Sequence, residues 1–259
     1  MKIDYTIRLE TENDYREVEN LTREAFWNVY RPGCLEHYVL HKFRDRADFV
    51  HQLSFVLEKN GKIIGHIMYA HSQIQCDNGD IIPIMTFGPL SILPEERGKG
   101  YGTMLLQYSM DKAKELEVKA LAITGNIDFY KKSGFVIAKN KGVRYDDDLD
   151  AEYFLIKELQ NGFLENISGT YKDPDGYFVD EKETEIFDGI GINISYSVAI
   201  DFRYDAGNVC SYRQRIGVIY KPPLLIDIEL IFYTRGYFRI CTVATVLSLN
   251  SNFCTDIGY

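Results

Sequence analysis

The feature that most constrains this chain is a run of alternating glycines between an apolar stretch and a helical pattern. The run is Arg97-Gly98-Lys99-Gly100-Tyr101-Gly102, and it follows the apolar residues Leu90 to Leu93. Glycine allows the backbone to approach a ligand closely, and the first N–H groups of a helix have no partner within the helix. Such groups bind phosphate readily. The sequence therefore predicts a strand, a tight turn and a helix arranged around an anionic group.

Two common phosphate-binding loops do not fit this spacing. A Walker-type loop has four residues between its glycines and ends in Gly-Lys-Ser/Thr, which is absent here. A dinucleotide-binding fold has the pattern G-x-G-x-x-G, and here the third glycine comes one residue early. The next predicted strand also ends at Thr124-Gly125 without an acidic residue. A turn that binds pyrophosphate outside these two loop types fits the spacing better. The structural alternative is a glycine-rich helix start that binds no ligand.

Hydrophobic periodicity predicts alternating strands and helices over the first 160 residues. We expect strands at residues 3–9, 53–58, 62–75, 81–93, 119–124, 135–138 and 153–157. We expect helices from Thr11 or Asn13 to about Phe26, and at residues 35–43, 100–117 and 127–132, with the third helix burying Leu106, Met110, Ala113 and Leu116. The pattern predicts a mixed α/β fold with a central, mostly antiparallel sheet flanked by helices.

Gly88-Pro89 interrupts the strand expected at residues 81–93. Proline cannot donate a hydrogen bond to a sheet, so this dipeptide predicts a bulge or a parting from a neighbouring strand.

Composition narrows the classes of function. The formal net charge of −9 argues against a protein that binds a nucleic-acid backbone. No apolar run is long enough to span a membrane, and the first residues have no apolar signal core, so we expect a cytoplasmic protein. The five cysteines lie far apart, as is usual for reduced thiols. His37 and His41 are spaced as a metal pair, but with no third ligand in view we expect a solvated helix face and no metal.

Two motifs resemble those of the GCN5-related N-acetyltransferase (GNAT) family. Leu93-Pro94-x-x-Arg97-Gly98-x-Gly100-x-Gly102 is similar to the family's acetyl-CoA motif, and Thr124-Gly125-Asn126-x-x-Phe129-Tyr130-x-x-x-Gly134-Phe135 is similar to its second signature. The segment at residues 153–171 resembles a subgroup of uncharacterised small bacterial acetyltransferases. The resemblance implies an acetyltransferase domain at residues 1–160 and a related polar extension at 161–188. Residues 189–259 form a β-prone tail with no counterpart and no assigned role.

The resemblance also implies a binding mode for acetyl-CoA as co-substrate. The cofactor would lie where two strands part, with its pantetheine arm beside the first strand and its pyrophosphate in the glycine turn. The cofactor-binding positions that this implies are Leu90, Ile92, Arg97, Gly98, Lys99, Gly100, Tyr101, Gly102, Thr103 and Asn126. Arg97 and Lys99 would add positive charge, and Thr103 a hydroxyl. Asn126 would contact the cofactor arm, or it only caps a short helix.

The implied reaction is direct attack of a primary amine, of a small molecule or a protein, on the thioester. Tyr130 stands where the family places a tyrosine that protonates the leaving thiolate; packing in the core is its alternative role. Many relatives carry a glutamate on the strand before the turn, whereas residues 81–93 contain no Glu, Asp or His. The base that deprotonates the amine is then either Glu24, or a residue of the loop at Asp146–Asp148, or a chain of water. The alternative for that loop is a solvated turn. The alternative function is a non-catalytic acyl-CoA-binding module with a partner-binding tail, and pairing through the tail would give a homodimer.

Overall fold

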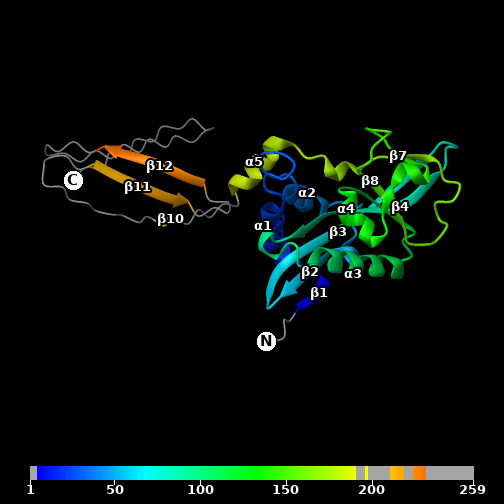
Figure 1. The fold of residues 1–259 in the computed structure, drawn as a ribbon, viewed down its shortest axis with the longest axis horizontal. Coiled ribbons are helices and arrows are strands. Elements are labelled where there is room, and N and C mark those ends of the chain that lie inside the picture. Colours follow the sequence, from blue (N-terminus) through cyan, green and yellow to red (C-terminus); the bar gives the residue numbers. More distant parts are fainter. Residues whose placement is uncertain (1–4, 191–195, 198–210, 219–223, 232–259) are drawn as a thin grey trace. The chain divides into compact units, whose positions relative to one another are not determined.

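The computed structural model describes residues 5–190, 196–197, 211–218 and 224–231. The chain divides into two compact units, Met1–Gly189 and Ile190–Tyr259. The strands of the first unit are β1 (Tyr5–Leu9), β2 (Phe55–Lys59), β3 (Lys62–Cys76), β4 (Ile81–Ile92), β5 (Ala120–Thr124), β6 (Val136–Ile137), β7 (Val143–Tyr145), β8 (Phe154–Glu158) and β9 (Gly169–Tyr171). Its helices are α1 (Tyr15–Phe26), α2 (Glu36–Phe43), α3 (Tyr101–Glu115), α4 (Ile127–Tyr130) and α5 (Glu181–Ile190) (Figure 1).

These strands form one sheet in the order β1-β2-β3-β4-β5-β8-β6, with β9 pairing both β3 and β7. The neighbours are antiparallel except for two parallel pairs, β4 with β5 and β7 with β9. Asn60-Gly61 makes the hairpin turn between β2 and β3, with both residues at positive φ, as this turn type requires. The prediction of a mixed α/β fold with a mostly antiparallel sheet is confirmed.

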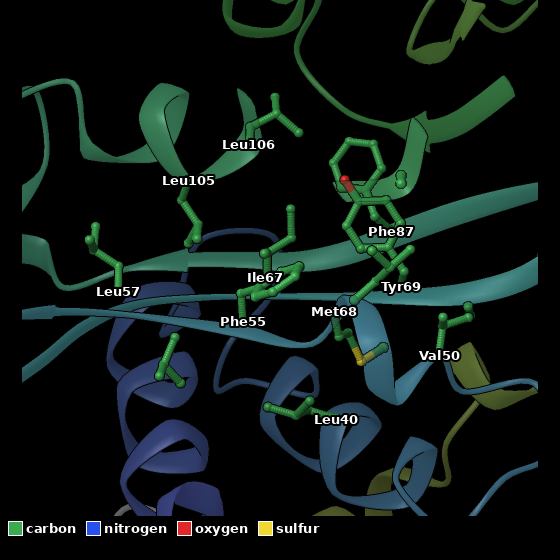
Figure 2. Close-up of a cluster of buried hydrophobic side chains, with 14 of the residues drawn as sticks. Leu40, Val50, Phe55, Leu57, Ile67, Met68, Tyr69, Phe87, Leu105 and Leu106 are labelled. Atoms are coloured by element: carbon green, nitrogen blue, oxygen red, sulfur yellow. The ribbon is translucent and has the colours of Figure 1, made fainter. Parts of the chain in front are cut away.

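Helices cover both faces of the two longest strands. α1 and α2 lie on one side of β3 and β4, and α3 lies on the other (Figure 1). Figure 2 shows the result in the core, where Leu105 and Leu106 of α3 stand above the strands and Leu40 of α2 stands below them. Because both faces are covered, the middle of β3 is a continuous buried run from Ile63 to Ala70 instead of an alternating one.

Three details of the predicted elements were wrong. α3 ends at Glu115, so Leu116 lies past its last turn and is 48% exposed, and Leu105 is buried instead. The loop between β6 and β8 contains the short strand β7, whose parallel pairing with β9 links residues distant in sequence. His37 is 2% exposed, because α5 packs over it: its ring lies 5.5 Å from that of Phe187. The expected solvated face is therefore wrong for His37, whereas His41 is exposed.

Within the described residues, no group of three or more His, Cys, Asp or Glu side chains is placed to hold a metal ion. Of the helices that the structure describes, none combines the length and the apolar character needed to cross a bilayer.

A buried group of charges joins α1, α2 and the first strands. The Arg44 guanidinium donates to Glu19 Oε1 at 2.7 Å and to Glu10 Oε1 at 2.6 Å. Ser54 Oγ donates to Glu10 Oε2 at 2.8 Å, and His66 Nε2 lies 3.5 Å from Glu10 Oε1. Burial raises the pKa of the Glu10 carboxyl, but the nearby His66 and Arg44 lower it more, to about 2. Glu10 is therefore ionised inside the folded protein.

This low pKa predicts a loss of stability in acid. A glutamate titrates near pH 4.5 when unfolded, so the contribution of Glu10 is complete above that pH and is lost as the pH falls toward 2. The full contribution is roughly 3 kcal/mol. Urea unfolding between about pH 3 and pH 6 should show a smaller acid-induced loss of unfolding free energy in Glu10→Gln than in the wild type. If the unfolding free energy of Glu10→Gln depended on pH as steeply as that of the wild type, the low pKa of Glu10 would be contradicted.

The second unit contains an antiparallel sheet in the order β10-β11-β12, with β10 at Tyr196–Ser197, β11 at Ser211–Val218 and β12 at Leu224–Ile231. Eight residue pairs join β11 to β12. Parts of the predicted β-prone tail, including residues 232–259, lie outside the described residues, as do Cys210, Cys241 and Cys254. Cys34 and Cys76 are free thiols.

Candidate active site

The central strands of the sheet part at the Gly88-Pro89 dipeptide. The register of β3 against β4 runs from Ile67↔Leu90 to Tyr69↔Phe87, so β4 carries one extra residue there, which is a β-bulge. On its other side, β4 pairs with β5 only at Met85↔Leu121 and Thr86↔Ala122. Gly88 therefore has no register partner on either side. The predicted bulge is confirmed, and the pairing of β4 with β5 ends just before the bulge, at Thr86.

The glycine turn lies at the end of β4, directly before α3. Gly98 and Gly100 adopt φ of +73° and +86°, which side chains other than glycine rarely adopt. A Cβ built on either glycine meets nothing within 4 Å, so the backbone there borders open space. The first helical bond of α3 runs from Met104 N to Gly100 O. Within the described chain, the backbone N–H groups of residues 98–103 find no acceptor, which leaves them available to an anion.

The charged side chains of the turn bind protein groups in this structure. Arg97 donates to the carbonyl oxygen of Ala25 near the end of α1. Lys99 Nζ donates to Glu95 O at 2.7 Å and to Glu96 Oε2 at 3.0 Å, and Lys59 Nζ donates to both Glu96 oxygens at 2.9 Å. These bonds hold the turn to α1 and to the β2–β3 hairpin. A direct contact of Arg97 or Lys99 with a ligand stays a prediction.

Three of the predicted cofactor positions have side chains in or against the core. Leu90, Ile92 and Tyr101 are half-buried and pack against the main core cluster. Ile92 also limits Gly65, where a Cβ would lie 2.6 Å from Ile92 Cδ1; a Cβ at Gly102 would make an ordinary contact, 3.6 Å from Ile92 Cγ1. The Thr103 side chain is exposed on the first turn of α3.

Tyr130 stands at the end of α4 among aromatic rings. Its ring centroid lies 5.9 Å from that of Phe87 on β4 and 5.5 Å from that of Phe135. A Cβ on Gly125 would lie 2.6 Å from a Tyr130 ring carbon, so glycine is needed there for the ring to fit. Burial raises the pKa of Tyr130 well above its usual range, which keeps the phenol protonated. The structure thus has a protonated phenol beside β4, next to the bulge.

Asn126 caps α4. Its Oδ1 accepts a hydrogen bond from the backbone N–H of Asp128 at 2.8 Å. This is the capping alternative that the sequence left open, and a contact with the cofactor arm stays a prediction.

Tyr177, which the sequence patterns did not single out, also reaches the bulge. Its Oη donates to the carbonyl oxygen of Gly88 at 2.9 Å. Tyr177 comes 89 residues later than Gly88, in a polar stretch without periodicity, so no local pattern indicates the contact. Only the three-dimensional fold brings it to β4.

A cavity of about 720 Å³ opens beside the far half of β3. Carboxylates border it from three separate segments: Asp48, Asp146, Asp173 and Asp175. His71 of β3, Arg46 and Lys172 also line it. Of the residues considered as a base, Asp146 lies at this cavity, and Glu24 is half-buried on α1. Asp147 and Asp148 lie on an exposed loop.

Comparisons with known proteins agree with this geometry. The sequence model of the Acetyltransferase (GNAT) family matches residues 19–135. The structure is similar to YhbS of Escherichia coli, a GNAT family N-acetyltransferase solved in complex with CoA, with a TM-score of 0.60 and 19% identity over 68% of this chain and 93% of that chain. It is also similar to a GNAT family acetyltransferase from Brucella melitensis solved with acetyl-CoA, with a TM-score of 0.54 and 21% identity over 68% of this chain and 99% of that one.

No curated protein sequence matches the chain. At these identities the solved structures establish the fold alone, and the family match rests on the sequence. The bulged and parted β4, the open glycine turn and the family match together show that residues 19–135 are a GNAT acetyltransferase domain.

Proposed function

We propose that this protein transfers the acetyl group of acetyl-CoA to a primary amine by direct attack. The observation that carries the proposal is that the open glycine turn, the parting of β4 from β5 and the Tyr130 phenol lie along one strand. The two similar structures were solved with CoA and with acetyl-CoA, which supports the same co-substrate here.

The residues of the site fit acetyl-CoA. The free N–H groups of residues 98–103 suit the pyrophosphate, and the absence of side chains at Gly98 and Gly100 leaves the space that its oxygens need. The backbone of β4 beyond Thr86, which has left β5, has groups to offer the amide-rich pantetheine arm. Acetyl-CoA supplies the activated acyl group, and the chain binds and orients it.

The chemistry needs one proton removed and one supplied. The nitrogen of the neutral amine forms a bond to the thioester carbonyl carbon, the carbon–sulfur bond breaks, and the thiolate takes up a proton while the amide nitrogen loses one. Tyr130 is our choice for the proton donor to sulfur, because its phenol ring lies against Phe87, the residue of β4 directly before the bulge.

The cavity beside β3 is our choice for the approach of the acceptor. Asp173 and Asp48 border it and also act electrostatically on Tyr177, which contacts the bulge. Its four carboxylates outnumber the side chains of Arg46 and Lys172, a balance that favours a cationic amine over an anion.

Titration calorimetry with acetyl-CoA tests the proposal. We expect the wild type to bind, and Gly100→Ala to bind roughly tenfold more weakly or worse, because a Cβ would enter the space for phosphate and strain a positive φ. Gly79→Ala is the matched control: Gly79 also has a positive φ and open space around its Cβ, but it lies in the turn before β4. Its affinity should equal that of the wild type.

A wild type that does not bind acetyl-CoA, or an equal loss in both variants, would overturn the proposal. Binding without thiol release across a panel of primary amines would instead support a non-catalytic acyl-CoA-binding module.

A further inference from the structure

The 172–188 segment runs from the end of β9 across α2 and into α5, beyond the residues that match the family. It packs closely on α2. A Cβ on Gly176 would lie 2.6 Å from Phe43 Cζ and 2.8 Å from Arg46 Nε, so only glycine allows the approach. Next to it, the Tyr177 ring meets the Phe43 ring edge-on, with centroids 4.8 Å apart. Because Phe43 is fully buried, this contact fixes where Tyr177 stands.

The hydroxyl of Tyr177 replaces a missing sheet bond. Gly88 has no register partner in β3, and it lies past Thr86, the last residue of β4 that pairs with β5. A backbone carbonyl inside the protein needs a donor, and Tyr177 Oη supplies one at 2.9 Å. Removing that hydroxyl therefore leaves the bulge without a bond from this side of the sheet.

Two tyrosines thus contact the same short stretch of β4. Tyr130 packs on Phe87, and Tyr177 bonds to Gly88. Burial raises the pKa of Tyr177 far above its usual range, and the neighbouring Asp173 raises it further, so this phenol remains a donor at any working pH. The two tyrosines differ in their hydrogen bonding, because the Tyr177 hydroxyl already donates its proton to the Gly88 carbonyl oxygen.

We propose that Tyr177 is a positioning residue for acetyl transfer: its bond to Gly88 holds the bulged backbone from Gly88 to Leu90 in the parted geometry that receives the thioester. The proposal rests on the proposed function and extends it to a residue outside the family-matching region. Tyr177 acts through β4 and touches no reacting atom. Small displacements of a bound thioester have large effects on rate, because attack requires close alignment.

Tyr177→Phe in the full chain tests this role, with Tyr38→Phe as the matched control. Tyr38 Oη also bonds the 172–188 segment, donating to Glu183 Oε2 at 2.8 Å, but does so at α5. With acetyl-CoA and a panel of primary amines as probes, we expect kcat to fall about tenfold or more in Tyr177→Phe. The KM for acetyl-CoA should change less than about twofold, and Tyr38→Phe should match the wild type. Without ligand, the Leu90 amide should exchange hydrogen faster only in Tyr177→Phe.

Each other outcome is decisive. Wild-type turnover in Tyr177→Phe, or an equal fall in both variants, would overturn the positioning role and leave the proposed function intact. A rise in KM with kcat unchanged would also overturn it, because that result indicates lost binding rather than lost alignment. A wild type that neither binds nor cleaves acetyl-CoA would overturn the proposed function, and the role with it.

Discussion

Replacing Arg44 with methionine is expected to lower the free energy of unfolding by about 3–5 kcal/mol. Only 3% of the Arg44 side chain is exposed, and it pairs with two carboxylates whose side chains are 2% and 5% exposed, those of Glu10 and Glu19. Its guanidinium also stacks on the Tyr15 ring, 3.9 Å from the centroid. Without it, two buried negative charges lose their shared cation, and water cannot replace it at this depth.

Arg46→Met is the comparison. Arg46 lies two residues further on and also pairs with a carboxylate, but its side chain is 38% exposed and that of its partner Asp48 is 24% exposed. Water screens such a pair, so we expect a loss below about 1 kcal/mol. Urea unfolding of the two variants at neutral pH measures the difference. Equal stability losses would show that burial does not set the strength of the Arg44 group.

The second large effect is on catalysis. Tyr130→Phe is expected to lower kcat about 100-fold, which is the lower end of what a general acid contributes. The ring stays, so the contacts with Phe87 and Phe135 should survive, and the Kd for acetyl-CoA should stay within about threefold. Thiol release with a panel of primary amines measures turnover, and calorimetry measures affinity.

Tyr108→Phe controls for the loss of a phenol elsewhere. Tyr108 is half-buried on α3, where its ring meets Phe55 edge-on at 5.3 Å, away from the bulge. It should turn over as the wild type does. A Tyr130→Phe variant that matches the wild type would leave Tyr130 with a packing role alone, and its hydroxyl would not be the acid.

The sequence predicts the parts of the fold whose cause is local. Asn60-Gly61 specifies a hairpin because its residues tolerate positive φ, and Gly88-Pro89 specifies a bulge because proline cannot complete a ladder. What it misses depends on distant residues. His37 has a helical spacing that fits an exposed face, but Phe187, 150 residues later, covers it. β7 and β9 are three residues each, too short for periodicity to reveal, and their partners are distant in sequence: β7 pairs with β9, and β9 also pairs with β3.

The candidate site divides in the same way. The turn at Gly98 and Gly100 could be predicted, because alternating glycines before a helix have few other uses. The side-chain directions could not: Arg97 and Lys99 suit a phosphate by charge, yet their bonds to Ala25 and Glu96 depend on how α1 and the β2–β3 hairpin meet the turn. Tyr177 lies in a segment whose composition indicates only turns. Its proposed role rests on the hydrogen bond to Gly88, which no local sequence pattern indicates.

The two-residue pairing between β4 and β5 has a consequence for synthesis on the ribosome. β5 is joined to the first half of the sheet at two positions only, whereas β8 pairs with it at five. A nascent chain that has emerged as far as Phe135, the end of the family match, therefore carries β5 as an edge strand, because its partner β8 has not yet emerged. The end of the family match is thus not the end of the sheet. We expect the sheet to be complete only after Tyr171 has emerged, because β9 at Gly169–Tyr171 pairs with both β3 and β7.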